Sequence, residues 1–249
     1  MKIIKYVLLI FLVLYFEFPQ YIFSQTTVVK RTIDSLENIL KDPKVKNKIV
    51  PLVDLAWEYR NIDPLNSLKL SDSALILLKK NPDPKEEGIV YNIKGVVNTI
   101  LGNYDAALEN HFISLRIREK IDDKKSLSAS LNNIALVYLE AKNYNKALEF
   151  FEKSLEIKLD LGDKVSISIT LNNIGNVYRL LKNYNKALEN HEKASLLLKG
   201  SDNYNAISLT YENLAKVYSD LGNHSIALDY LKEALKYLEL FGNIQGKAL

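Results

Sequence analysis

The 249-residue chain contains no cysteine, and this absence excludes several kinds of chemistry at once. Disulfide bonds, thiolate metal sites and a cysteine nucleophile are impossible, although the redox compartment stays open. With only 3 histidines, the chain has little material for imidazole chemistry. Its 9 glycines and 6 prolines are too few for the many turns of an all-β protein, so long helices are expected.

The chain also lacks a strong excess of charge of either sign. Its 33 basic and 30 acidic residues give a net charge of +3, which provides no field for binding nucleic acid or an anionic membrane. Hydrophobic residues make up 47% of the chain, a composition typical of a folded globular protein. We therefore expect no nucleic-acid partner and an ordinary folded chain.

The N-terminal residues 1–24 have the three parts of a signal peptide. Lys2 and Lys5 form a positive start, residues 6–16 form an apolar run, and Ser24 closes the segment. The apolar run is shorter than the roughly 20 residues that cross a bilayer, so we expect no stable membrane span in the mature chain. The sequence therefore predicts export to a periplasmic or other extracytoplasmic location. An uncleaved membrane anchor is the alternative.

From about residue 51 onward the sequence repeats with a period of forty. Four segments align without a gap, and a fainter copy precedes them. A fixed period of this length is typical of a solenoid built from stacked helical or strand units. An apolar stripe within residues 25–50 is expected to form a capping helix and lead-in. The predicted repeats cover residues 51–90, 91–130, 131–170, 171–210 and 211–249.

Each repeat has the pattern of two amphipathic helices. In the third repeat, Leu131, Ile134 and Tyr138 share one face of a first helix. A break at Asn143 separates it from the second helix, since asparagine suits both a left-handed turn and the N-cap of a helix. Glycine is expected to end the second helix, near Gly242 in the last repeat.

The order of small and aromatic residues within a repeat resembles the tetratricopeptide repeat (TPR) family. In the third repeat this order is Ala135, Tyr138, Ala147, Phe151 and Ser154. The resemblance extends over about residues 50–249, although the period is forty instead of about thirty-four. It implies an all-α, right-handed superhelix of about five helix pairs behind the capping helix. It also implies a scaffold that binds a peptide or protein without catalysis.

A second resemblance concerns the layout of the whole chain. A signal peptide, a short helix, the segment LAWEYRNIDP and long TPR repeats resemble the extracytoplasmic input regions of Bacteroidota TPR sensor kinases and regulators. This resemblance implies an alternative function. The chain would then be the sensory N-terminal portion of a sensor histidine kinase or transcriptional regulator, before its output domain.

The last repeat leaves an apolar helix side without a following repeat to cover it. Leu231, Leu235 and Leu238 lie on this side, and Tyr237 and Phe241 add to it. An exposed apolar area of several hundred Å² is unusual for a monomer. We therefore expect this end to contact further repeats, a partner or a second copy of the chain.

No group of residues in the sequence has the pattern of a catalytic or metal site. His111 and His191 lie eighty residues apart in the same column as Phe151, so packing is expected of them, and they cannot share one metal ion. The carboxylates are scattered over predicted outer helix faces, where solvated charges far outnumber acid–base pairs. We predict no catalytic residue, no metal and no cofactor.

Asparagine recurs in two adjacent columns of the first helices, which line the concave surface of a TPR superhelix. An asparagine amide offers a donor and an acceptor together, and these match one peptide unit of an extended chain. We therefore predict a peptide-binding groove. The alternative is that the asparagines tie adjacent helices together. The predicted groove residues are Asn92, Asn132, Asn133, Asn172, Asn173, Asn176, Arg179, Asn213 and Lys216.

Overall fold

The computed structural model describes residues 18–247, and it describes side chains from residue 28 to residue 242. Most of the predicted signal peptide, residues 1–17, lies outside this part of the chain. The described residues form eleven helices and no strand, so the predicted all-α class is confirmed. None of these helices combines the length and the apolar character that crossing a membrane requires. The helices are α2 (Phe18–Lys41), α3 (Ile49–Tyr59), α4 (Pro64–Lys80), α5 (Pro84–Ile100), α6 (Tyr104–Lys120), α7 (Lys124–Glu140), α8 (Tyr144–Leu161), α9 (Lys164–Leu180), α10 (Tyr184–Leu197), α11 (Tyr204–Asp220) and α12 (His224–Lys247).

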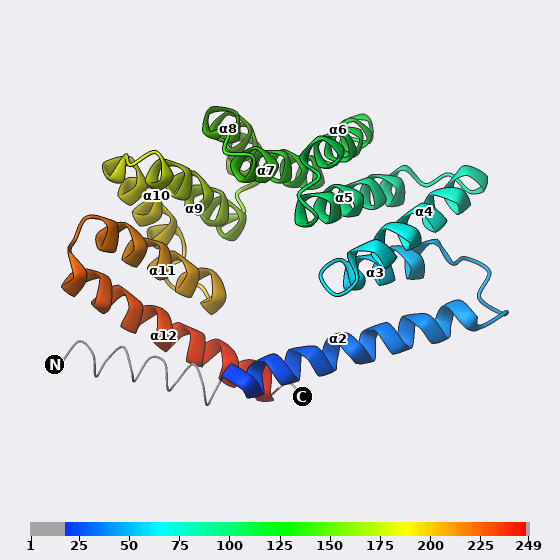
Figure 1. Ribbon diagram of the computed structural model, residues 1–249, viewed down its shortest axis with the longest axis horizontal. Coiled ribbons are helices and arrows are strands. Elements are labelled where there is room, and N and C mark those ends of the chain that lie inside the picture. The colour runs from blue at the N-terminus through cyan, green and yellow to red at the C-terminus, as the bar shows by residue number, and fades with distance from the viewer. Residues whose placement is uncertain (1–17, 248–249) are drawn as a thin grey trace.

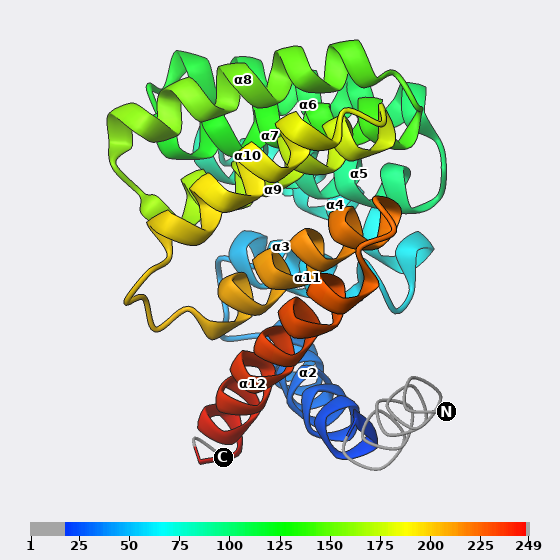
Figure 2. The same ribbon diagram turned by 90° about the vertical axis from the view of Figure 1, so that its left-hand side faces the viewer.

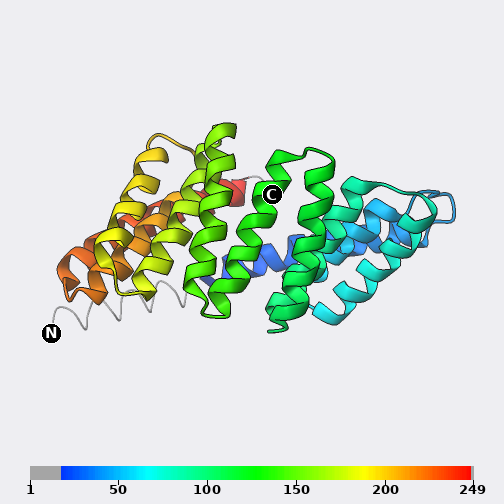
Figure 3. The same ribbon diagram turned by 90° about the horizontal axis from the view of Figure 1, so that it is seen from above.

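Ten of these helices form five pairs that stack into an arch. Figure 1 shows α3, α5, α7, α9 and α11 along the inside of the arch and α4, α6, α8 and α10 along the outside. Seen from above, the pairs lie side by side in chain order (Figure 3). The helix α2 packs against α3 and so covers the first pair, while α2 and α12 extend below the arch in Figure 2. The predicted α-solenoid of about five pairs with a preceding helix is confirmed.

Short polar turns end each first helix and start its partner. In the turn that follows α7, the left-handed residue is Lys142, with a φ of 59°. The next residue, Asn143, is the N-cap of α8, and its side chain accepts a hydrogen bond from the backbone N–H of Lys146. Asp163 caps α9 in the same way. The predicted cap at Asn143 is therefore confirmed, but the left-handed position belongs to the residue before the asparagine.

The last helix is longer than predicted. The helix α12 continues to Lys247 and passes through Gly242, so the prediction that it ends near this glycine is wrong. Glycine favours a helix end where its backbone is left-handed, as at Gly162 with a φ of 71°, and Gly242 has no such φ. Leu231 on α12 is 41% exposed, whereas the corresponding Phe151 on α8 is fully buried. No helix among the described residues covers this side of α12.

The two helices of a pair approach closely where a small residue faces a ring. A Cβ atom added to Gly95 on α5 would lie 2.6 Å from the imidazole of His111 on α6. Gly175 on α9 repeats this contact with His191 on α10, again at 2.6 Å. With each imidazole in its present position, no Cβ atom fits at the glycine that faces it. The predicted close approach at the column of small residues is confirmed.

Both histidines are buried, and burial determines their charge. Burial lowers the pKa of His111 to about 4, and the positive charge of Arg118 acts in the same direction. The usual pKa of histidine is about 6.5, so a proton binds more tightly to this residue in the unfolded chain. The stability that depends on neutral His111 is therefore fully present above about pH 6.5 and is lost as the pH falls toward 4.

This burial predicts that one double variant resists acid better than the wild type. Gly95→Ala/His111→Phe copies the Ala135–Phe151 contact of the next pair, so it should unfold within about 1.5 kcal/mol of the wild type at pH 7. Between pH 7 and pH 4 the wild type should lose on the order of 3 kcal/mol more. Urea unfolding at several pH values measures both. Equal acid losses in the two proteins would contradict a neutral, buried His111.

Candidate functional site

The inner helices leave one stripe of residues open to solvent. On α7, Lys125, Ala129 and Glu140 are exposed, and Asn132 and Leu136 between them are half-buried. Steps of three and four residues place all five on one helical face. Because α7 lies on the inside of the arch with α8 outside it, this stripe faces the interior of the arch (Figure 1). We call the matching stripes of α3, α5, α7, α9 and α11 the inner face.

Apolar side chains contribute a large part of the inner face. Six of them are 37–47% exposed, and they follow the same helical spacing as the asparagines. The guanidinium of Arg60 stacks 3.7 Å from the ring centre of Trp57, which places a cation over the largest of these side chains. The sequence pattern did not predict that these apolar side chains are exposed. The exposed apolar residues are Val50, Trp57, Ile100, Ile169, Leu180 and Leu209.

Four of the predicted asparagines bind one another across neighbouring repeats. Asn133 Nδ2 on α7 donates to Asn92 Oδ1 on α5 at 2.8 Å. One repeat later, Asn173 Nδ2 on α9 donates to Asn132 Oδ1 on α7 at 3.3 Å. These bonds tie consecutive inner helices together, as the alternative interpretation expects. Each amide has two N–H groups and two acceptor lone pairs, so each of these half-buried side chains keeps capacity for a further partner.

Asn172 has a different environment and lies inside the protein. Only 2% of it is exposed. Its Nδ2 donates to Thr210 Oγ1 on α11 at 2.8 Å, and its Oδ1 accepts from His191 Nδ1 on α10 at the same distance. Burial lowers the pKa of His191 to about 4, with Arg179 and Lys216 adding to the effect, so the ring is neutral in this network. Asn172 therefore joins three helices and does not reach the inner surface.

The remaining predicted residues lie at the α9 and α11 end of the arch. Asn213 is also 2% exposed, and its Oδ1 accepts from Lys216 Nζ at 3.4 Å. Arg179 is paired with Asp220 across the two helices, with NH1 2.8 Å from Oδ2. Asn176 is half-buried on the stripe of α9. This end of the inner face thus combines polar side chains with the exposed apolar residues Ile169, Leu180 and Leu209, whereas the exposed residues Val50, Trp57 and Ile100 make the other end more apolar.

The buried histidines are placed for packing. His111 and His191 are 1% and 0% exposed, on the helices that pack against Gly95 and Gly175. Across the part of the chain that the structure describes, no group of three or more His, Asp or Glu side chains is arranged to hold a metal ion.

The comparisons with known proteins agree with this architecture. The tetratricopeptide repeat profile matches residues 86–160 and 166–239. The search of curated proteins finds no match. Among solved structures, BtubC (BKLC) from P. vanneervenii is similar, with 20% identity, a TM-score of 0.65, and coverage of 88% of this chain and 91% of that one.

Two further solved structures share the fold. One is a STAND signal-transduction ATPase with a tetratricopeptide repeat sensor from Pyrococcus horikoshii, with 22% identity and a TM-score of 0.71; the match covers 88% of this chain but only 34% of that protein. The other is a Rap protein in complex with competence and sporulation factor, with 15% identity, a TM-score of 0.64, and coverage of 91% and 74%. With more than half of its length matched by the family profile, the chain belongs to the tetratricopeptide repeat family.

Proposed function

We propose that the chain is an exported scaffold that binds an extended peptide or protein segment along its inner face, without catalysis. The observation that carries this proposal is the composition of that face. It combines exposed apolar side chains such as Ile169 and Leu209 with half-buried amides such as Asn132 and Asn173. The TPR fold itself suits protein binding, and the Rap protein with this fold was solved with a bound factor.

The two kinds of side chain have separate roles in the proposal. The amides use their remaining donors and acceptors on the peptide backbone, and each such bond stabilises the complex by about 0.5–1.5 kcal/mol. The apolar side chains cover apolar residues of the ligand, at about 25 cal/mol for each Å² removed from water. Because backbone contacts tolerate many sequences, the apolar positions supply the selectivity.

Charge on the inner face should weaken peptide binding. We expect peptides of about twelve residues, selected from a random phage library on the wild type, to bind the Ile169→Glu/Leu209→Glu variant at least tenfold more weakly. Burying a carboxylate against an apolar ligand residue costs the complex at least the 1.4 kcal/mol that a tenfold loss represents. Fluorescence anisotropy measures the dissociation constants.

The matched control places the same charges on the outside of the arch. Ile76 on α4 and Leu159 on α8 are 58% and 59% exposed, so Ile76→Glu/Leu159→Glu adds the same two carboxylates away from the inner face. We expect a change of less than twofold. Equal affinity for the inner-face variant and the wild type would contradict the proposal, as would an equal loss in both variants.

Export is part of the proposal, and the N-terminal segment supports it. Residues 1–24 have a positive start and a short apolar run. We predict that these residues direct an alkaline phosphatase lacking its own leader out of the cytoplasm and make it active. Replacing two residues of the apolar run, Leu9→Arg/Leu12→Arg, should abolish that activity. An inactive fusion with residues 1–24 would contradict an exported location.

The uncovered side of α12 supports the second candidate function. In the third repeat, the first helix of the next repeat packs against Phe151. The corresponding residue on α12 is Leu231, and it is exposed. We propose that further repeats, as in a sensor kinase or regulator, or a second copy pack there. Light scattering on residues 25–249 should then show concentration-dependent association, and Leu231→Glu should abolish it. Monomers at every concentration in both proteins would show that this end needs no cover.

A further inference from the structure

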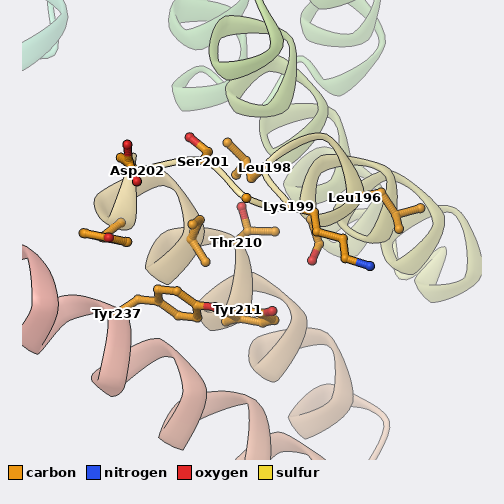
Figure 4. A pocket seen from close by; sticks show the side chains of 12 residues that line it. Leu196, Leu198, Lys199, Ser201, Asp202, Thr210, Tyr211 and Tyr237 are labelled. Carbon is orange, nitrogen blue, oxygen red and sulfur yellow. The ribbon is translucent and has the colours of Figure 1, made fainter.

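A pocket of about 500 Å³ lies where α10, α11 and α12 meet (Figure 4). None of its lining residues belongs to the inner face. Leu198 and Ile207 are buried in a small apolar cluster there, and Tyr211 and Tyr237 pack against this cluster. The pocket is therefore a second concave surface with its own chemistry, and the proposed peptide groove does not use it.

The pocket exists because one repeat departs from the pattern of the other four. The second helices of these four repeats carry leucine at one shared position, and the fourth repeat carries Ser195 there. Serine has a hydroxyl group where leucine has an isopropyl group, so part of the space that leucine would fill stays open. The corresponding leucines are Leu75, Leu115, Leu155 and Leu235.

In the preceding repeat, the leucine at this position fills the corresponding space. Leu155 packs against the cluster that contains Ile167 and Leu171. Forty residues further along the chain, the corresponding residues are Ile207 and Tyr211, and both line the pocket. The helix α10 has 14 residues and α8 has 18, so the helix beside the pocket is also shorter.

The walls of the pocket suit a flat ring. The rings of Tyr211 and Tyr237 stack on each other, with centroids 5.8 Å apart and an angle of 22° between their planes. Tyr204 and Tyr230 also pack on this pair, with centroids 6.1 Å from Tyr237 and 5.9 Å from Tyr211, so the pair is held in a larger aromatic cluster. Aromatic edges bind favourably to the face of another ring. Leu198 and Ile207 are buried, and they form an apolar wall of the pocket that a ligand ring can contact.

Two opposite charges lie at the rim. The side chains of Lys199 and Asp202 line the pocket on opposite sides (Figure 4). Both are exposed, and neither forms an ion pair with another described residue. The ammonium and carboxylate of a free amino acid are bonded to one carbon, so a bound molecule would place either its ammonium beside Asp202 or its carboxylate beside Lys199.

The geometry points to a binding site for the aromatic side chain of an amino acid, either free or within a peptide. The ring occupies the space that Ser195 leaves open and contacts Tyr211, Tyr237 and Ile207. The volume of about 500 Å³ lies within the range of about 300–1,000 Å³ that is typical of small-ligand pockets. This inference stands whether or not the inner face binds a peptide.

Calorimetric titration of the purified protein tests the site with four probes. L-phenylalanine and L-tryptophan represent the free ligand, N-acetyl-L-phenylalanine amide represents an aromatic residue within a peptide, and L-alanine is the control without a ring. We expect the aromatic probes to bind and alanine not to bind. Tighter binding of the free amino acids identifies a free ligand, and tighter binding of the capped amide identifies a peptide.

Two variants link binding to the pocket. Ser195→Leu restores the leucine of the other repeats, so it should keep the fold and weaken every aromatic probe at least tenfold. Ser219→Leu places the same change at an exposed position of α11 outside the pocket and should leave binding unchanged. Lys199→Ala/Asp202→Ala alters exposed side chains only, and should weaken the free amino acids about threefold to fivefold but the capped amide less than twofold.

Three results would overturn the inference. They are the absence of binding by all aromatic probes at millimolar concentration, equal binding of alanine, and unchanged aromatic binding in a folded Ser195→Leu variant. If circular dichroism shows that Ser195→Leu has lost helix, the Lys199→Ala/Asp202→Ala variant decides. Unchanged binding of the free amino acids to that variant would then overturn the inference.

Discussion

The close crossing of the two helices in each pair is the contact on which the rest of the structure depends. In the second, third and fourth pairs a very small residue on the first helix faces a ring on the second, as at Gly95 and His111 or Ala135 and Phe151. The first pair has the smaller Ser71 in place of the ring. With this crossing in place, consecutive pairs stack and enclose the first helices on all sides but one. The inner face is the side that remains, so the candidate binding surface is a direct consequence of how the pairs pack.

Much of this fold can be predicted from the sequence because its determinants are local. Spacings of three, four and forty residues give the helix faces and the five pairs, and Asn143 and Asp163 give two of the caps. The roles of the asparagines are not local. Asn132 and Asn172 occupy the same column, yet the first is half-buried and the second is enclosed by Thr210 and His191. The residue beside Asn132 that corresponds to His191 is Phe151, which offers no hydrogen bond, so the role of each asparagine depends on its partner across the helix pair.

Some of the candidate binding positions cannot be recognised from the sequence, and others can. The apolar residues of the inner face, such as Ile169, resemble core residues until the open side of the helix is known. Ser195 is different, because aligning the repeats shows at once that it replaces a leucine. Such a substitution marks a position where one repeat has fewer apolar contacts than the others. A stacked protein can use such a place as a pocket without losing the pairs on either side.

Site-specific photocrosslinking tests the central claim most directly, because it reports where a bound peptide lies. Benzoylphenylalanine placed at position 169 on α9 lies on the inner face, and at position 76 on α4 it lies on the outside of the arch, where the natural side chain is more exposed (58% against 39%). If a peptide binds along the inner face, a peptide selected on the wild type should crosslink at position 169 and not at position 76. Crosslinking at position 76 with none at position 169 would contradict binding along the inner face.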